Sequence, residues 1–230
     1  MKSPVIVLLC LLLINIISVF AFSSTIQEEE HTMNMQLILN GTDVATETFY
    51  LKNMSENFLE VGAKTIIDIK YKGTVYQAEY QTSGKFSDLK VESYNATVTA
   101  TNGKFHYSLK RLINGFEVSF ETPTISDKKV LNVSDDLYLL DNNIMWNWFL
   151  IVKVLEKTKK DKLKVIIPQL SSHPMIDTPI FDLKILDKYS ENNYKFYIIS
   201  LVNSQIIIKL DSNGKIIEIL EGAFRVVQSD

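Results

Sequence analysis

Short stretches in which apolar and polar residues alternate, each bounded by turn-forming residues, recur along most of this chain. In residues 67–72, for example, Ile67, Ile69 and Tyr71 alternate with Asp68 and two lysines. An alternation of period two gives a strand one apolar and one polar face. The pattern therefore predicts antiparallel strands with one side in water, and not the uniformly apolar strands of a parallel sheet.

Asn-Gly pairs separate several of these stretches, at positions 40–41, 102–103 and 114–115. Both residue types tolerate the positive φ that a tight hairpin turn requires, so each pair predicts a hairpin. Residues 215–227, which follow a polar turn, are predicted to form one last long strand. No internal repeat at a fixed period is present. We expect a mainly β protein whose long antiparallel meander forms a curved sheet or half-barrel.

One segment departs from the strand pattern, because residues 144–157 hold both tryptophans and an almost unbroken apolar run. On a helix, Trp148, Ile151 and Leu155 form a stripe that neighbouring apolar residues widen beyond half of the circumference. The run is about a dozen residues long, whereas a membrane span needs roughly 20. Asp141 and the two asparagines after it are candidate N-cap residues. The segment predicts one apolar helix lying in the concave face of the sheet.

The aromatic residues of this predicted helix allow two interpretations. They can simply plug the core of the fold. Alternatively, Trp146, Trp148, Phe149 and Ile151 line an incompletely filled cavity that binds a lipid or another apolar ligand. An open apolar cavity of roughly 300 Å³ or more would favour the ligand site. A sealed core would favour a structural or interaction protein.

The first 23 residues have the organisation of a secretory signal peptide. One lysine precedes an apolar run from Val5 to Phe20, and small residues follow at Ala21 and Ser23. We expect residues 1–23 to be a signal peptide, 24–31 a polar leader and 32–230 a single β-rich domain. The expected location is the periplasm or the cell exterior, with membrane contact only if the apolar run stays uncleaved.

Export bears on two further features of the sequence. Cys10 is the only cysteine, so the mature chain is expected to have no disulfide and no cysteine-bound metal. Four Asn-x-Ser/Thr sequons are possible glycosylation sites in a host that modifies exported proteins. They lie at Asn40, Asn53, Asn95 and Asn132.

No pattern in the chain predicts a catalytic, metal or nucleotide site. The three histidines, His31, His106 and His173, lack metal-ligand spacing. Ser171 and Asp177 lie near His173 in sequence, but without the context of a nucleophile elbow. A net charge of −3, with no basic stripe, argues against nucleic acid as a partner. We expect no cofactor and no enzymatic activity.

Four features together resemble the lipoprotein-carrier type of half-barrel found in bacterial envelope proteins. They are the signal peptide, the antiparallel meander, the segment "LLDNNIMWNWFLIVKVL" as a central helix after most of the strands, and the closing hairpin "IIIKLDSNGKIIEIL". The chain is also similar to an uncharacterised family of bacterial periplasmic proteins. The resemblance implies binding of acyl chains between sheet and helix, around Trp146, Trp148, Phe149 and Ile151. The absence of a lipid-attachment cysteine argues against the membrane-anchored members.

These observations lead to two expectations of function. The first is an exported, non-enzymatic protein that binds a lipid or other apolar ligand between sheet and helix. The second is a cell-surface structural or protein-interaction domain with a filled core, whose sheet edge adds a strand of a protein partner.

Overall fold

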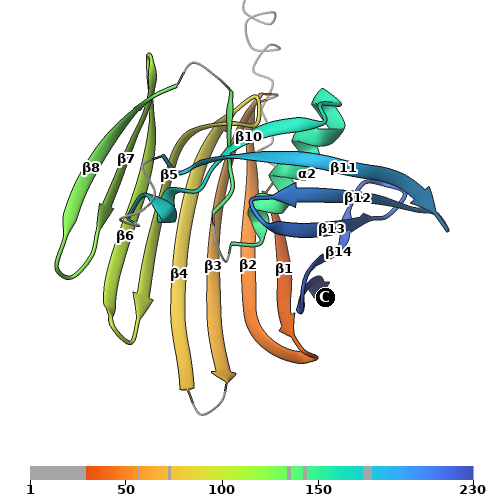
Figure 1. Cartoon of the computed structure of the whole chain (residues 1–230), viewed down its shortest axis with the longest axis horizontal. Coiled ribbons are helices and arrows are strands. Elements are labelled where there is room, and N and C mark those ends of the chain that lie inside the picture. Colours follow the sequence, from red (N-terminus) through yellow and green to blue (C-terminus); the bar gives the residue numbers. More distant parts are fainter. Residues whose placement is uncertain are drawn as a thin grey trace, which may run out of the picture.

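The computed structural model describes residues 30–55, 57–71, 74–133, 136–141, 144–172 and 178–229. In these residues one sheet of fifteen strands curves around a helix (Figure 1). The predicted signal peptide and most of the predicted leader lie outside the described residues. None of the described helices is long and apolar enough to cross a membrane.

The first half of the sheet is an uninterrupted antiparallel meander, which we call the N-terminal wing. Each strand pairs with the next along the chain, from β1 to β8. The strands are β1 (Glu30–Leu39), β2 (Thr42–Ser55), β3 (Phe58–Tyr71), β4 (Thr74–Ser87), β5 (Lys90–Ala100), β6 (Gly103–Leu112), β7 (Gly115–Glu121) and β8 (Ser126–Asn132).

The second half, the C-terminal wing, continues the same sheet from the other side of β1. The last strand pairs antiparallel with the first, so β1 and β15 lie side by side in the middle of the sheet. In Figure 1 strands β11, β12 and β13 of this wing run across those of the N-terminal wing. They are β9 (Leu137–Leu139), β10 (Lys162–Ile166), β11 (Ile180–Glu191), β12 (Tyr194–Leu201), β13 (Ser204–Leu210), β14 (Ile216–Glu221) and β15 (Phe224–Ser229).

The predicted fold class is confirmed: the protein is mainly β, with a curved antiparallel sheet around one apolar helix. At the first Asn-Gly pair, Asn40 and Gly41 both have positive φ, at 50° and 81°, and they join β1 to β2. One strand prediction was wrong. Residues 215–227 do not form one strand but the hairpin of β14 and β15, because Gly222 adopts φ 59° and reverses the chain.

One strand pair is parallel, which the alternation of residues did not predict. β9 and β10 pair parallel, and the helix α2 (Trp146–Thr158) lies between them in the chain. Two neighbouring parallel strands need a long crossover connection, which a helix supplies. All three residues of β9 are buried, as is typical of parallel strands. The apolar helix is thus the crossover of a β-α-β unit.

Helix α2 begins two residues later than predicted and its predicted N-cap was wrong. Met145 occupies the N-cap position and makes no side-chain capping hydrogen bond. Asp141 instead accepts a hydrogen bond from the Tyr94 hydroxyl, and the two asparagines after it lie outside the described residues. At the other end Lys159 adopts φ 53° and its N–H donates to the Leu155 carbonyl at 3.1 Å.

The edge of the C-terminal wing folds back onto the inner face of the N-terminal wing. β9 lies against β5, and the short 3-10 helix η1 (Pro168–Ser172) lies against β6 and β7. The sheet therefore coils around α2. Its inner side forms one apolar core, to which every strand of the N-terminal wing contributes at least one buried residue.

Candidate ligand site between helix and sheet

The N-terminus of α2 is held by three polar side chains on the otherwise apolar inner face of the sheet. We call Glu47 on β2, Thr65 on β3 and Thr82 on β4 the polar patch; all three are buried. One Glu47 oxygen accepts the Trp146 N–H at 2.6 Å, and the other accepts the Met145 N–H at 3.0 Å. The Thr65 hydroxyl donates to Glu47 at 2.6 Å. A carboxyl group from the sheet thus accepts the hydrogen bonds that an N-cap side chain would otherwise accept.

Burial raises the pKa of Glu47 from its ordinary value of 4.5 to about 7. Removing a carboxylate from water disfavours its charged form, and this effect outweighs the three hydrogen bonds that lower the pKa. Near neutral pH, Glu47 therefore exchanges between its protonated and ionised forms while it caps the helix.

The raised pKa predicts that stability falls as the pH rises. Between pH 4.5 and about 7 the folded protein keeps the Glu47 proton, which the unfolded chain releases. The stabilising contribution is complete below pH 4.5 and is lost as the pH rises through 7. Over this window we expect the free energy of unfolding to fall by about 3 kcal/mol.

Urea denaturation at a series of pH values measures this slope. The Glu47→Gln variant has no proton to release at this position, so its stability should change much less over the same window. Equal pH dependence in the two proteins would contradict the prediction.

Trp146 anchors the helix to the same face of the sheet. Its side chain is completely buried and packs edge-on against Phe86, with ring centroids 5.8 Å apart. The centroid of the Tyr94 ring lies 6.3 Å from that of Trp146. Its indole N–H donates to the Thr82 hydroxyl at 3.1 Å, which satisfies the one polar atom of the side chain. The start of α2 is therefore fixed by both packing and hydrogen bonds.

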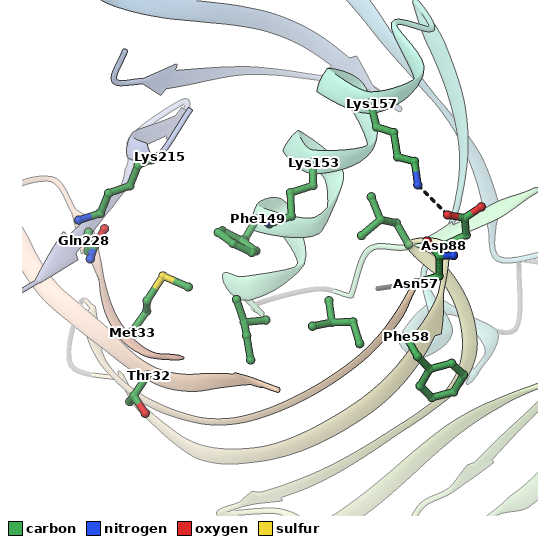
Figure 2. A pocket seen from close by; sticks show the side chains of 13 residues that line it. Thr32, Met33, Asn57, Phe58, Asp88, Phe149, Lys153, Lys157, Lys215 and Gln228 are labelled. Atoms are coloured by element: carbon green, nitrogen blue, oxygen red, sulfur yellow. Dashed lines mark hydrogen bonds and ion pairs between the residues drawn. The ribbon is translucent and has the colours of Figure 1, made fainter. Parts of the chain in front are cut away.

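A large cavity lies between α2 and the N-terminal wing, and Figure 2 shows it from close by. Its volume is about 640 Å³. Apolar side chains of the sheet, of the turn between β4 and β5 and of the helix form its wall, namely Met33, Leu51, Phe58, Leu59, Leu89 and Phe149. Its other lining residues are polar: Thr32, Asn57, Asp88, Lys153, Lys157, Lys215 and Gln228. Because three lysines line it, we call it the lysine-rimmed cavity.

A second, smaller cavity lies between α2 and the C-terminal wing, with a volume of about 230 Å³. Most of its lining is apolar and includes Trp148, Leu201, Ile206 and Phe224. Among the lining residues that the structure describes there is no lysine, and the charged ones are the carboxylic acids Asp141 and Glu221. The helix thus separates a cavity lined by three lysines and one aspartate from a cavity whose charged lining residues are both acidic.

The four residues predicted to line a ligand site do not lie together. Trp146 and Ile151 are completely buried in the core and line neither cavity. Phe149 lines the lysine-rimmed cavity and packs on Phe49 of β2, with ring centroids 6.2 Å apart. Trp148 lines the second cavity. Trp146 and Ile151 therefore belong to the core, whereas Phe149 and Trp148 line two separate cavities.

The sequence did not indicate several residues of the site. The sheet residues of the lysine-rimmed cavity could not be assigned without knowing which strands face the helix. Lys153 and Lys157 lie within the predicted helix, but no pattern in the sequence places them at a ligand site. Glu47 did leave a signal, because it occupies an inward position between Ala45 and Phe49 in an alternating strand. A lone carboxyl group on an apolar face indicates a buried polar contact.

The remaining residues that were considered as glycosylation, metal or catalytic sites are exposed or half-buried, or their side chains lie outside the part that the structure describes. Asn40, Asn95 and Asn132 have exposed side chains, and the side chain of Asn53 is not among those described. His106 lies on the outer face of β6, with Nδ1 3.0 Å from the Thr97 hydroxyl. The side chains of His31, Ser171, His173 and Asp177 lie outside the described ones. No three His, Cys, Asp or Glu residues in the described part of the chain are placed to hold a metal ion.

Comparison with known proteins identifies proteins of similar fold but indicates no activity. No protein-family model matches the chain, and none of the curated proteins matches it. A β-barrel-like protein of the domain of unknown function DUF1849 from Brucella abortus is similar in structure, with a TM-score of 0.51 and 12% identity over 87% of this chain and 94% of that chain. A DUF1089 family protein from Pseudomonas aeruginosa has a TM-score of 0.45 and 12% identity, over 78% and 90% of the two chains.

The first of these likenesses shows a shared β-barrel-like fold. The expected resemblance to an uncharacterised bacterial half-barrel protein is therefore confirmed at the level of the fold. The finer resemblance, to lipoprotein carriers, stays a proposal.

Proposed function

We propose that this chain is an exported, non-enzymatic protein that binds an apolar chain, such as a lipid acyl chain, in the lysine-rimmed cavity. The observation that carries the proposal is the cavity itself, with its volume of about 640 Å³ between helix and sheet. Ligand pockets measure roughly 300–1,000 Å³. A half-open pocket of this size, with apolar side chains of both helix and sheet in its wall, supports a ligand site.

The packing of α2 supports a cavity that persists without its ligand. The helix is held at its start by Trp146 and Glu47, and near its end the Glu156 carboxylate accepts hydrogen bonds from Lys195, at 2.8 Å, and from the Tyr197 hydroxyl. Phe149 and Lys153 lie between these two attachments. The wall that they form is therefore fixed to both wings of the sheet. A preformed apolar site binds a chain with little cost of reorganisation.

The resemblance to lipoprotein carriers and the signal-like first 23 residues support the same proposal. Carriers of that type bind acyl chains between sheet and helix. An exported protein with an acyl site could hold one lipid chain away from water between two membranes or surfaces.

A second candidate function is a surface interaction protein that adds a partner strand to β8. In the described part of the sheet, β8 pairs only with β7, so its other side is an edge. Val130 of β8 is 58% exposed. Lys128 and Lys129 lie beside it, however, and lysines on an edge strand discourage pairing with another chain. This observation makes the edge the weaker candidate.

Native mass spectrometry of residues 24–230, purified without detergent, together with organic extraction, tests the proposal. We expect a bound species that leaves on denaturation and is recovered as a lipid in the extract. A clean apo mass that persists after incubation with mixed lipids would reject the proposal and favour an interaction protein.

Two variants at neighbouring residues then show which of the two cavities binds the ligand. Phe149→Asp places a charge in the lysine-rimmed cavity, and Trp148→Asp places one in the second cavity. Both side chains are half-buried, so both variants should fold, as judged by circular dichroism. We expect Phe149→Asp to lose the bound lipid and Trp148→Asp to keep it, since an ionised group in an apolar wall is costly to desolvate. Loss with Trp148→Asp alone would move the site to the second cavity.

A further inference from the structure

The described lining of the lysine-rimmed cavity carries more positive than negative side chains. Lys157 forms an ion pair with Asp88, with the nitrogen and oxygen 2.6 Å apart (Figure 2). Hydrogen bonding to Lys157 holds the pKa of the Asp88 carboxyl below its ordinary value, so this pair is internally neutral. Among the lining residues that the structure describes, Asp88 is the only acidic one. In this described lining, Lys153 and Lys215 therefore remain as uncompensated positive charges.

Lys153 extends from the middle of α2 along the apolar wall. Its ammonium group lies 4.8 Å from the centroid of the Phe149 ring, and its side chain is exposed. No ion pair joins it to a carboxylate in the described part of the chain. Its aliphatic stem thus lies beside the apolar surface and its charge stands at the opening. An amphiphile bound against Phe149 would have its polar end next to this ammonium group.

Lys215 comes from a different element, the residue just before β14, and reaches the same cavity. Figure 2 shows it beside Gln228, across the cavity from Lys153, with Met33 near the floor between them. Its side chain is exposed and has no carboxylate partner among the residues that the structure describes. A negative group at the opening would therefore meet positive charge from both sides, while Gln228 offers a neutral hydrogen-bond donor.

This positive rim is a local feature and not the result of a generally basic protein. The whole chain has a formal net charge of −3. The second cavity, on the other side of the same helix, is lined by two carboxylic acids and no lysine. A negatively charged amphiphile is therefore expected to enter one cavity and be repelled from the other.

We propose that the ligand of the lysine-rimmed cavity is a single-chain amphiphile with an anionic head group, a carboxylate or a phosphate. Its hydrocarbon chain lies on the wall formed around Phe149, and its head group lies between Lys153 and Lys215. This inference rests on the proposed function and names the class of its ligand. Lys153 and Lys215 make the cavity prefer an anionic head group over a neutral or cationic one. The apolar wall contributes the part of the affinity that does not depend on the head group.

Four probes with the same oleyl chain test the head group. Calorimetry on the delipidated chain 24–230, at about pH 8, compares oleate, lysophosphatidic acid, monoolein and oleylamine, with inorganic phosphate as the head group alone. We expect both anions to bind about tenfold or more tightly than neutral monoolein, and oleylamine to bind least. Affinity for the anions should fall with added salt, whereas affinity for monoolein should not. The stronger of the two anions identifies the head group as carboxylate or phosphate.

Lysine-to-methionine variants keep the apolar stem and remove the charge. Lys153→Met and Lys215→Met should each weaken oleate binding about three- to tenfold, and the double variant more, with monoolein binding changed by no more than about twofold. Lys104→Met is the matched control, because Lys104 is exposed on the outer face of β6 and lines neither cavity. It should bind all probes as the wild type does.

Three results would overturn the inference. Equal affinity of all four oleyl probes, unchanged in the lysine variants, would show an apolar site without head-group selection and would leave the proposed function intact. Binding of inorganic phosphate as tight as that of lysophosphatidic acid would show an anion site that needs no chain. Failure of every oleyl probe to bind would reject both the inference and the proposed function.

Discussion

Replacement of Trp146 by alanine is expected to lower the free energy of unfolding by about 3–5 kcal/mol. The side chain is completely buried, so its removal opens a cavity that the surrounding sheet can only partly fill. The edge contact with Phe86 and the contact with Tyr94 are lost with it. The Thr82 hydroxyl also loses its indole donor. Since native domains are stable by about 5–15 kcal/mol, this is a large fraction of the total.

Urea denaturation followed by circular dichroism measures this loss, and Trp148 provides the matched control. Trp148 lies two residues further along the same helix, but it is only half-buried and lines the second cavity. We expect Trp148→Ala to cost less than about 2 kcal/mol, since less of its surface leaves water on folding. Equal losses in the two variants would contradict the assignment of Trp146 as the anchor.

The Glu47→Ala variant is expected to lose about 2–4 kcal/mol of stability near pH 6, where the wild-type side chain is largely protonated. The variant leaves the Met145 and Trp146 N–H groups buried at the start of a helix without an acceptor. It also leaves the Thr65 hydroxyl without its partner. An unsatisfied buried polar group costs more than the net gain of the hydrogen bond it once made.

Thr46→Ala is the control for this experiment, because Thr46 precedes Glu47 on the same strand and points to the exposed outer face. Its replacement should change stability by less than about 0.5 kcal/mol. Glu47→Gln retains one carbonyl acceptor and should lose less than Glu47→Ala. A loss for Glu47→Ala no greater than that for Thr46→Ala would show that the helix does not need this cap.

The sequence predicted correctly those turns and strand faces whose conformation depends only on neighbouring residues. The Asn40-Gly41 turn and the inward face of Ile67 and Ile69 came out as predicted, since hairpin turns and alternation are properties of a few consecutive residues. The helix was predicted within two residues at its start and one at its end. The split of 215–227 at Gly222 was missed, because apolar residues on both sides of it resembled one strand.

Long-range contacts were missed for a different reason. The pairing of β1 with β15 and the parallel pairing of β9 with β10 join residues that are far apart in the chain. Alternation reports which face of a strand is apolar, but not which strand lies next to it. The cap of α2 was assigned to its own flanking residues, whereas Glu47, about a hundred residues earlier, supplies it.

By itself the sequence determined the class of the fold, the faces of most strands and the place of one apolar helix. These depend on turn chemistry and on the period of hydrophobic residues, which act over a few positions. Only the tertiary structure decided that Trp146 and Ile151 belong to the core while Phe149 and Trp148 line separate cavities. The physical reason is that a helix apolar on most of its sides can be buried in several orientations. Its contacts with the two wings select one of them, and with it the face that remains open to a ligand.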